Sequence, residues 1–175
     1  MHPHARLTFM TDDRHFRIRN ARPDDVALIL QFIQELARYE KLAHEVSATE
    51  RDIQANLFGT RPRAECIIAE HDGTAIGFAL YFHNFSTFLG KPGLYLEDLY
   101  VQPAFRGQGY GRGLLSHLAK LALDRGCGRF EWAVLDWNAP AIGFYRKLGA
   151  AIMADWRINR LSGSALEKLA SEASD

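Results

Sequence analysis

Apolar residues recur along the chain with two different periods, and their alternation predicts helices and strands in turn. Helical spacing is clearest in two stretches, which predict a first helix over 26–37 and a longer one that stops before Gly126. Their apolar stripes consist of Val26, Ile29, Leu30, Ile33, Leu36 and Ala37, and of Leu114, Leu115, Leu118, Leu121 and Ala122. Shorter helices are expected over 49–58, 139–147 and 164–170.

Strand-like segments occupy the stretches between these helices. They cover 16–19, 65–70, 75–82, 94–101, 129–135 and 156–161. His71-Asp72-Gly73 has the composition of a hairpin turn, whereas 84–92 interrupts the pattern with Ser, Thr, Gly and Pro among aromatic residues. Helices and strands alternate without a repeat or a long linker, so we expect one mixed sheet covered by helices, an α/β (α+β) fold.

A glycine-rich run separates the strand 94–101 from the longest helix. Glycines occupy positions 107, 109, 111 and 113, where the absence of a side chain lets backbone amides approach a ligand closely. The following helix points the positive end of its dipole at the same place. The combination predicts a cradle for a phosphate or pyrophosphate group, with an ordinary strand-to-helix turn as the alternative.

Two common phosphate-binding motifs do not fit this run. A P-loop requires Lys followed by Ser or Thr behind its last glycine, and none of these glycines has that pair behind it. The dinucleotide fingerprint requires a third glycine five residues after its first, and Arg112 and Leu114 occupy those positions.

Composition limits the kinds of partner. The chain has 175 residues, 47% of them apolar, which suffices for one domain with its own core over 16–175. Residues 1–15 show little periodicity and are expected to form a flexible N-terminal extension. The 21 basic residues balance 21 acidic ones, so no basic excess points to nucleic acid or to an anionic membrane. We therefore expect a small-molecule partner.

Cysteine and histidine usage points to a reducing compartment and to no bound metal. Cys66 and Cys127 are too few for a disulfide scaffold, and we expect both to be inert thiols. Apart from His2 and His4 near the terminus, no histidines have metal-ligand spacing. No apolar stretch is long enough for a membrane span and no signal peptide is evident, so a cytoplasmic protein is expected.

The run Arg106-x-x-Gly109-x-Gly111, preceded by Val-x-Pro, resembles motif A of the GCN5-related N-acetyltransferase (GNAT) superfamily, which binds the pyrophosphate of acetyl-CoA. Further segments are similar to the diamine (spermidine/spermine) acetyltransferases and the thialysine N-epsilon-acetyltransferases. These segments are LYLEDLYV at 94–101, VLDWN at 134–138, FY at 144–145 and LGA at 148–150. LARYEKL at 36–42 and STF at 86–88 are closer to the thialysine branch.

The resemblance implies a twisted, mostly antiparallel sheet flanked by helices, with splayed central strands that admit a pantetheine chain by strand addition. It also implies a single acetyltransferase domain over 16–175, with acetyl-CoA as co-substrate and no metal. The family is usually dimeric, so a homodimer is expected, with the segment 156–161 in the contact between the two subunits. The positions carried over for acetyl-CoA are Leu99, Tyr100, Val101, Arg106, Gly107, Gln108, Gly109, Tyr110, Gly111, Arg112, Asn138 and Tyr145. Amides at 107–112 are expected to supply most hydrogen bonds, and Arg106 and Arg112 to add charge.

Acetyl transfer to an amine requires a base, because an alkylamine with a pKa near about 10 is almost wholly protonated at neutral pH. Glu97, on the strand that leads into the cradle, matches the family's proposed base, acting through water. A carboxylate paired with a neighbouring Arg or Lys is the alternative. An acyl-enzyme route has no support, since neither cysteine is well placed for it.

The departing thiolate requires an acid. Tyr145 matches the family tyrosine whose hydroxyl points at the coenzyme sulfur, and a phenol pKa of about 10 suits proton donation to a thiolate. Packing of Tyr145 beside Phe144 in the core is the alternative. Asn138 is expected to cap the same helix, with Pro140 in its first turn.

Acidic and aromatic residues are expected around the amine acceptor, because carboxylates and aromatic faces suit a cation. The carried-over positions are Tyr39, Glu40, Glu97, Asp98, Glu131, Trp132 and Ala133. For Glu40, a solvated carboxylate at a helix end is the alternative. The connection from Ala150 to Trp156 is shorter than in the diamine enzymes, which leaves Asp155 as the candidate for an acidic contact carried there.

Three functions remain open at the level of the sequence. The resemblance favours acetyl transfer to a small primary amine, such as a polyamine, a diamine or a lysine analogue like thialysine. Acetylation of a protein or peptide would need an open groove, whereas Tyr39 and the segment 84–92 are expected to close a pocket. A non-catalytic acyl-CoA-binding module would keep the glycine run and have no use for Glu97 and Tyr145 together.

Overall fold

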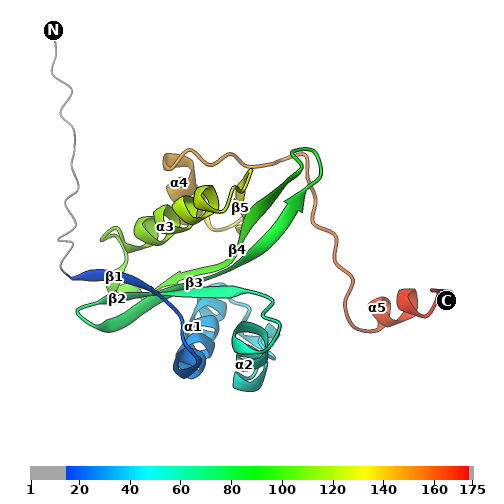
Figure 1. The fold of residues 1–175 in the computed structure, drawn as a ribbon, viewed down its shortest axis with the longest axis horizontal. Coiled ribbons are helices and arrows are strands. Elements are labelled where there is room, and N and C mark those ends of the chain that lie inside the picture. The colour runs from blue at the N-terminus through cyan, green and yellow to red at the C-terminus, as the bar shows by residue number, and fades with distance from the viewer. Residues whose placement is uncertain (1–14, 174–175) are drawn as a thin grey trace, which may run out of the picture. The chain divides into compact units, whose positions relative to one another are not determined.

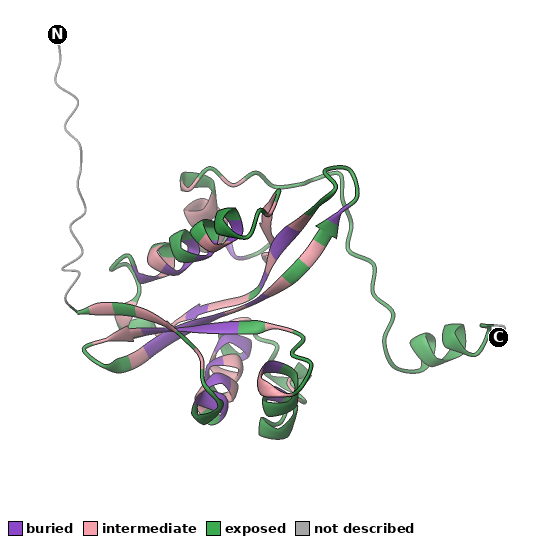
Figure 2. Ribbon diagram, in the orientation of Figure 1, coloured by how far each residue is buried: buried purple, intermediate pink, exposed green. Residues whose placement is uncertain are grey.

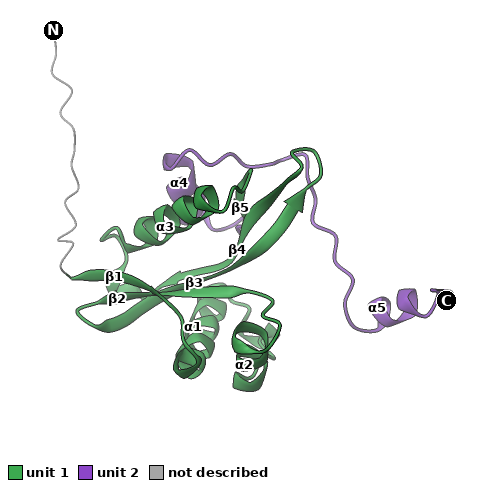
Figure 3. Ribbon diagram, viewed as in Figure 1, with its two compact units in different colours: residues 1–133 green, residues 134–175 purple. Residues whose placement is uncertain are grey.

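The computed structural model describes residues 15–173, so the extension expected over 1–15 lies outside the described residues, except for His15. The chain divides into two compact units, one up to Ala133 and one from Val134 (Figure 3). The first unit carries a sheet and the helices that cover it, and the second unit carries two helices in its described part.

A five-stranded sheet forms the centre of the first unit (Figure 1). Its strands lie in sequence order and are β1 (Phe16–Asn20), β2 (Glu65–His71), β3 (Thr74–Ser86), β4 (Lys91–Val101) and β5 (Phe130–Trp132). The first four strands are antiparallel to one another, and β5 runs parallel to β4. This arrangement confirms the expected mixed, mostly antiparallel sheet.

Helices cover both faces of this sheet. The helices α1 (Val26–Tyr39) and α2 (Glu50–Phe58) lie on one face, and α3 (Tyr110–Asp124) lies on the other (Figure 1). Short 3-10 turns, η1 (Pro23–Asp25), η2 (Ala43–Glu45) and η3 (Pro103–Phe105), connect the longer elements. Helix α2 begins where the sequence predicts it, because the Thr49 hydroxyl accepts a hydrogen bond from the Asp52 amide at 3.3 Å.

Apolar residues of α1, α2 and the sheet form a buried cluster, and Figure 2 colours parts of these elements as buried. Phe32 lies outside the predicted stripe of α1 and yet is fully buried, with its ring 5.8 Å from that of Phe78 and 5.9 Å from that of Tyr100. Leu30 and Ile33, which the stripe includes, are only half-buried. The buried face of α1 is therefore centred closer to Phe32 than the stripe suggests, because aromatic contacts with β3 and β4 set its orientation.

Two hairpins join the antiparallel strands. Asp72 (φ 49°) and Gly73 (φ 76°) form the predicted turn between β2 and β3, since a two-residue turn of this hand needs positive φ at both positions. The predicted interruption over 84–92 is narrower than expected: only 87–90 form a turn, because β3 continues to Ser86 and β4 begins at Lys91, with Asn84 opposite Gly93. Cross-strand pairing outweighs the low strand propensity of Gly and Pro in this segment.

A β-bulge at Glu97 changes the alternation of side chains along β4. Leu96 lies opposite Tyr81, whereas Asp98 lies opposite Leu80, so Glu97 is the extra residue between them. Leu80 packs against the cluster beneath α1 and α2. Asp98 therefore faces α1, although unbroken alternation would place it on the same face of the sheet as Leu96.

The second unit contains α4 (Ala139–Lys147) and α5 (Gly163–Ala170). Helix α4 has its predicted ends: Asn138 Oδ1 accepts from the Ala141 amide at 3.3 Å, and Gly149 has φ 90°. The prediction of a strand over 156–161 is wrong, since the structure shows no strand there. A strand needs the backbone of a neighbour, and the described part of the second unit offers none.

Candidate active site

The glycine-rich run forms an exposed turn between β4 and α3. Gly107 and Gly109 have φ of 76° and 93°, in the left-handed region that glycine adopts without strain. Gly109 is also the N-cap of α3, and residues 106–109 are exposed. A side chain at either glycine would strain the backbone, so the shape of the turn depends on both.

Backbone amides of this turn have no partners within the described chain. In the first backbone hydrogen bond of α3, the Gly113 amide donates to Gly109 O at 2.9 Å. Among residues 15–173, the backbone amides of 107–112 donate no hydrogen bond. Free amides at a helix N-terminus, together with the helix dipole, favour an anion. The turn therefore fits a diphosphate group, and the exposed Arg112 adds a positive charge in the first turn of α3.

Strand β5 covers only part of the edge of β4. The two strands pair only from Leu94 to Leu96, because β5 ends at Trp132 instead of continuing to 135 as predicted. Beyond this point β4 continues to Val101, and its edge at 97–101 is open within the described part of the first unit. The splayed central strands stay a prediction, since every residue of the short β5 is paired with β4. Such an edge offers amides and carbonyls to a ligand that itself contains amides, which fits a pantetheine chain.

Three carboxylates gather where β5 ends. Asp98 is half-buried, and burial raises its pKa to about 6, with the charges of Glu97 and Glu40 adding to the effect. Glu40 is the C-cap of α1, and burial raises its pKa as well. Glu97 is exposed on the bulge. Negative charge is therefore concentrated beside the open edge of β4, an arrangement that suits a cationic acceptor.

Arg106 extends over two tyrosine rings on the α1 side of the sheet. Its guanidinium carbon lies 4.5 Å from the ring centroid of Tyr39 and 5.5 Å from that of Tyr100, which are cation–π distances. Its Nε donates a hydrogen bond to Val101 O at 2.8 Å. The side chain thus connects the glycine turn to the end of α1, and the faces of the two aromatic rings attract its positive charge.

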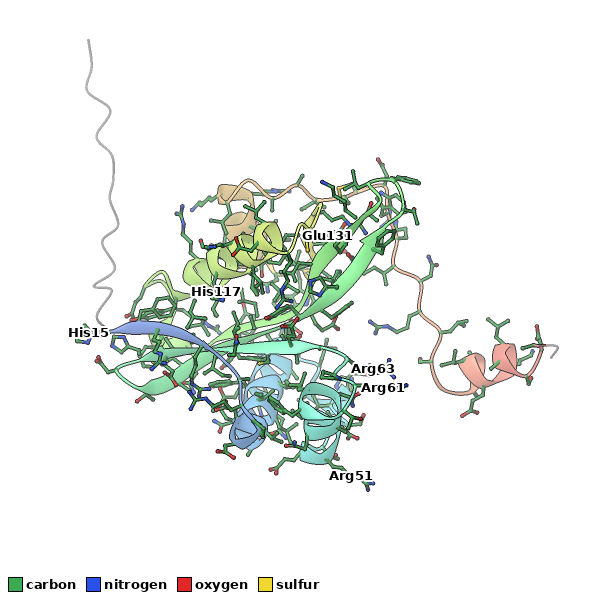
Figure 4. The ribbon with its side chains drawn as sticks, in the orientation of Figure 1. His15, Arg51, Arg61, Arg63, His117 and Glu131 are labelled. Atoms are coloured by element: carbon green, nitrogen blue, oxygen red, sulfur yellow. The ribbon has the colours of Figure 1, made fainter. Side chains whose placement is uncertain are left out.

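Glu131 lies on β5 (Figure 4) and has two polar partners. Its Oε2 accepts a hydrogen bond from Asn84 Nδ2 at 3.0 Å and lies 2.8 Å from Arg129 Nε. Burial raises the pKa of Tyr95, and the charges of Glu97 and Glu131 add to this effect, so both carboxylates act on the same ring. Glu131 therefore joins β3 to β5 and also contributes to the negative charge near Glu97.

Asn138 and Tyr145, the remaining predicted positions, belong to the second unit. Asn138 is buried at the start of α4, which it caps. Tyr145 is half-buried on α4, with its ring 5.4 Å from that of Phe144. The ring contact fits a packed tyrosine, and the partial exposure fits a hydroxyl that reaches a ligand.

Nothing in the sequence singles out Glu35. Its carboxylate accepts a hydrogen bond from the Tyr100 hydroxyl, and this contact adds to burial in raising the pKa of Tyr100. Glu35 lies on α1 next to buried Leu36, where nothing in the helical pattern separates it from a solvated carboxylate. Only the position of α1 over β4 reveals the contact.

The described residues do not meet the requirements of a metal site or a membrane span, and Cys66 does not meet those of a cysteine nucleophile. Among residues 15–173, no group of three or more His, Cys, Asp or Glu side chains could hold a metal ion. No helix in the same range is long and apolar enough to cross a membrane. Cys66 is buried, and burial raises its thiol pKa well above the usual range, which makes it a poor nucleophile.

An open strand edge next to an anion-binding turn accommodates a long ligand that combines amides with a diphosphate, and coenzyme A has this composition. Carboxylates beside the same edge suit an amine that receives the acyl group. The fold and the site together fit an acyltransferase that uses an acyl-CoA thioester.

Comparison with known proteins narrows this class. The sequence model of the Acetyltransferase (GNAT) family matches residues 29–150, and the chain belongs to this family. Thialysine N-epsilon-acetyltransferase of Mus musculus is 39% identical over 165 residues, which cover 88% of this chain and 96% of that protein. L-ornithine N5-acetyltransferase NATA1 of Arabidopsis thaliana is 33% identical, with coverage of 93% and 91%. The chain is therefore an N-acetyltransferase, and members of its family use acetyl-CoA.

A solved structure shares this fold. An integron cassette protein from the mobile metagenome of V. cholerae superposes with a TM-score of 0.76 at 28% identity, covering 90% of this chain and 99% of that one. The similarity to the thialysine branch, expected from LARYEKL at 36–42 and STF at 86–88, is confirmed by the mouse relative.

Proposed function

We propose that the protein transfers the acetyl group of acetyl-CoA to a small primary amine, of the class of polyamines, diamines and lysine analogues such as thialysine. The observation that carries this proposal is the group of carboxylates Glu40, Glu97 and Asp98 beside the open edge of β4. An acceptor with two amines can present one to the thioester while the other stays charged beside a carboxylate. The names of the mouse and Arabidopsis relatives refer to thialysine and L-ornithine, which supports the same class.

In the proposed reaction the acceptor nitrogen attacks the thioester carbonyl directly, so a carbon–nitrogen bond forms and the carbon–sulfur bond breaks. Glu97 takes the amine proton through water, since it is exposed on the bulge where β5 ends. Tyr145 donates its phenolic proton to the departing thiolate and regains one from solvent. No acyl-enzyme is needed, and the buried thiol of Cys66 is unsuited to form one.

Acetyl-CoA is assigned to the open edge of β4 and to the glycine turn. The strand contributes the backbone of Leu99, Tyr100 and Val101, and the turn contributes the amides of Gly107, Gln108, Gly109, Tyr110, Gly111 and Arg112. Asn138 and Tyr145 contribute from α4. Arg106 supports this site from the side, because its guanidinium lies over Tyr39 and Tyr100.

The acceptor is assigned to the α1 side of β4 and to β5. The contributing residues are Tyr39, Glu40, Glu97, Asp98, Glu131, Trp132 and Ala133. With a pKa of about 6, Asp98 is largely ionised at neutral pH, and a bound ammonium group favours its ionised form further. The same residue therefore attracts a cation in spite of its burial.

Residues 16–175 are proposed to act as one acetyltransferase domain in a cytoplasmic homodimer with no nucleic acid, membrane or metal partner. The family match at 29–150 crosses the boundary between the two units, which supports one domain. Exposed apolar residues of the C-terminal segment support a dimer, since such surface is normally covered in solution: Ile152, Met153, Trp156, Ile158 and Leu161. The free thiols Cys66 and Cys127 fit a reducing compartment.

A thiol-release assay with acetyl-CoA tests this proposal. The acceptors to compare are thialysine, lysine, ornithine, diamines, spermidine and amino sugars, with N-terminal and lysine-containing peptides as the second group. We expect thiol release with free amines that carry a second amine and little release with peptides. Release with peptides alone would favour a protein acetyltransferase, and binding of acetyl-CoA without release in any mixture would favour a non-catalytic module.

A further inference from the structure

The side chain of His71 contacts the residues on both sides of the glycine turn. Its ring centroid lies 5.7 Å from that of Phe105, in η3 before the turn, and 5.6 Å from that of Tyr110, the first residue of α3. The Nδ1 atom of His71 also lies 2.8 Å from the Tyr110 hydroxyl. One side chain at the end of β2 therefore touches both ends of the segment 106–109.

These contacts are part of an aromatic cluster that holds the start of α3 against the sheet. Tyr110 is only 7% exposed, and its ring lies 4.9 Å from that of Phe16 on β1. A Cβ atom added at Gly113 would lie 2.5 Å from the Phe16 ring, so the helix approaches the sheet closely at this point. The cluster is a firm support for the turn, because it unites β1, β2, η3 and α3.

Two side-chain hydrogen bonds hold the turn to the residues before it, from Arg106 Nε to Val101 O at 2.8 Å and from Gln108 Nε2 to Ala104 O at 3.0 Å, and neither of them fixes the backbone amides. Gly107 and Gly109 have left-handed backbones, the residues from 106 to 109 are exposed, and the amides of 107–112 have no partners among the described residues. Glycine-rich segments lose much conformational entropy when a ligand orders them, which weakens binding. Fixing both ends of the segment beforehand reduces this loss.

We propose that His71 is a positioning residue for acetyl-CoA: by holding Phe105 and Tyr110, it keeps the amides of 107–112 converged before the diphosphate binds. This inference rests on the proposed assignment of the diphosphate to the turn. His71 acts through the backbone of the turn and does not itself touch the reacting atoms.

The polar groups that face His71 account for the direction of its hydrogen bond. Its Nε2 lies 3.4 Å from a carboxylate oxygen of Asp72, which also pairs with His15. A neutral ring that carries its proton on Nε2, the nitrogen nearer to Asp72, leaves Nδ1 to accept the hydroxyl proton of Tyr110. A phenylalanine at position 71 can keep the ring contacts, and it removes the hydrogen bond to Tyr110.

Calorimetric titration with CoA in the absence of any amine tests this proposal with a readout that does not depend on turnover. His71→Phe and Tyr110→Phe should each raise the Kd for CoA roughly three- to tenfold, the effect of one lost hydrogen bond. The double variant should lose no more than either single variant, because both remove the same bond. KM for the amine should stay near the wild-type value in all three variants.

His117→Phe is the matched control, since His117 is exposed on α3 away from the turn (Figure 4), and its Kd should equal that of the wild type. An unchanged Kd in both single variants would overturn the proposal, even if their melting temperatures fell, because the contact would then serve only the fold. Additive effects of the two substitutions would also overturn it. A wild type that binds no CoA would overturn the assignment of the turn as well, which separates the two failures.

Discussion

The guanidinium of Arg106 lies 4.5 Å from the ring centroid of Tyr39. This contact joins the turn proposed for the diphosphate to the end of α1, where the acceptor is proposed to bind. The hydrogen bond from Arg106 Nε to Val101 O holds the side chain along β4. Arg106, a residue of the motif proposed to bind acetyl-CoA, therefore contacts Tyr39, a residue of the proposed acceptor site.

Replacement of Arg106 by Gln removes a cation–π contact worth about 0.5–1 kcal/mol at an exposed site. We expect KM for the amine to rise roughly two- to fivefold and Kd for acetyl-CoA to change less. Steady-state kinetics and calorimetry measure the two constants separately, with Arg17→Gln on the exposed side of β1 as control. A large rise in Kd for acetyl-CoA with an unchanged amine KM would show that the guanidinium serves the diphosphate instead.

The raised pKa of Asp98 predicts pH-dependent stability. Folding raises this pKa from 3.8 to about 6, so the folded state holds the proton more tightly and stability falls as pH rises from about 4 to about 6. Asp98→Asn should therefore raise the free energy of unfolding above pH 6, by at most about 3 kcal/mol, with little effect near pH 4. Urea unfolding at a series of pH values measures this difference.

The same variant should bind the amine more weakly, because the substitution removes a charge from the acceptor site. Asp98→Asn should therefore be more stable than the wild type and have a higher KM for the amine. This combination is expected when a residue contributes to binding and lowers stability. Equal destabilisation at both ends of the pH range would contradict the burial and charge interactions assigned to Asp98.

The backbone of Gly109, with φ of 93°, predicts a specific effect on acetyl-CoA. Alanine in a left-handed conformation costs about 1–2 kcal/mol, so Gly109→Ala should shift the turn and raise Kd for acetyl-CoA roughly tenfold. Gly90→Ala, at φ of 61° in the turn between β3 and β4, places the same strain elsewhere. The control should lose stability and keep its affinity, and a matching loss of affinity in both variants would argue against the cradle.

Local signals in the sequence predict part of this architecture well. Asn138 and Gly149 mark the ends of α4, and Asp72-Gly73 marks a hairpin, because caps and tight turns depend on neighbouring residues. The glycine run likewise marks the turn before α3. The residues that shape these elements lie within a few positions of them.

Features that depend on distant pairing could not be predicted in the same way. The bulge at Glu97 arises from the register between β3 and β4, and it turns Asp98 toward α1 against the expected alternation. The early end of β5 and the contact from Glu35 to Tyr100 depend on neighbouring elements as well. The strand expected over 156–161 had the right composition and lacked a partner within its unit.

Tyr145→Phe tests the proposed acid. Loss of the phenolic proton should lower kcat roughly 100-fold and leave Kd for acetyl-CoA nearly unchanged, because the ring and its contact with Phe144 remain. Tyr81→Phe, which removes a hydroxyl that contacts Glu65 instead, is the control and should keep its kcat. Wild-type turnover in Tyr145→Phe would remove this residue from the mechanism.

Glu97→Gln tests direct acetyl transfer with Glu97 as the base, when free thiol and N-acetylated thialysine are measured together from acetyl-CoA. We predict that the wild type forms the two products in equal amounts, and that the variant turns over roughly 100-fold more slowly while it binds acetyl-CoA as tightly as the wild type. Equal turnover by the two proteins, or thiol release without the acetylated amine, would contradict direct acetyl transfer assisted by Glu97.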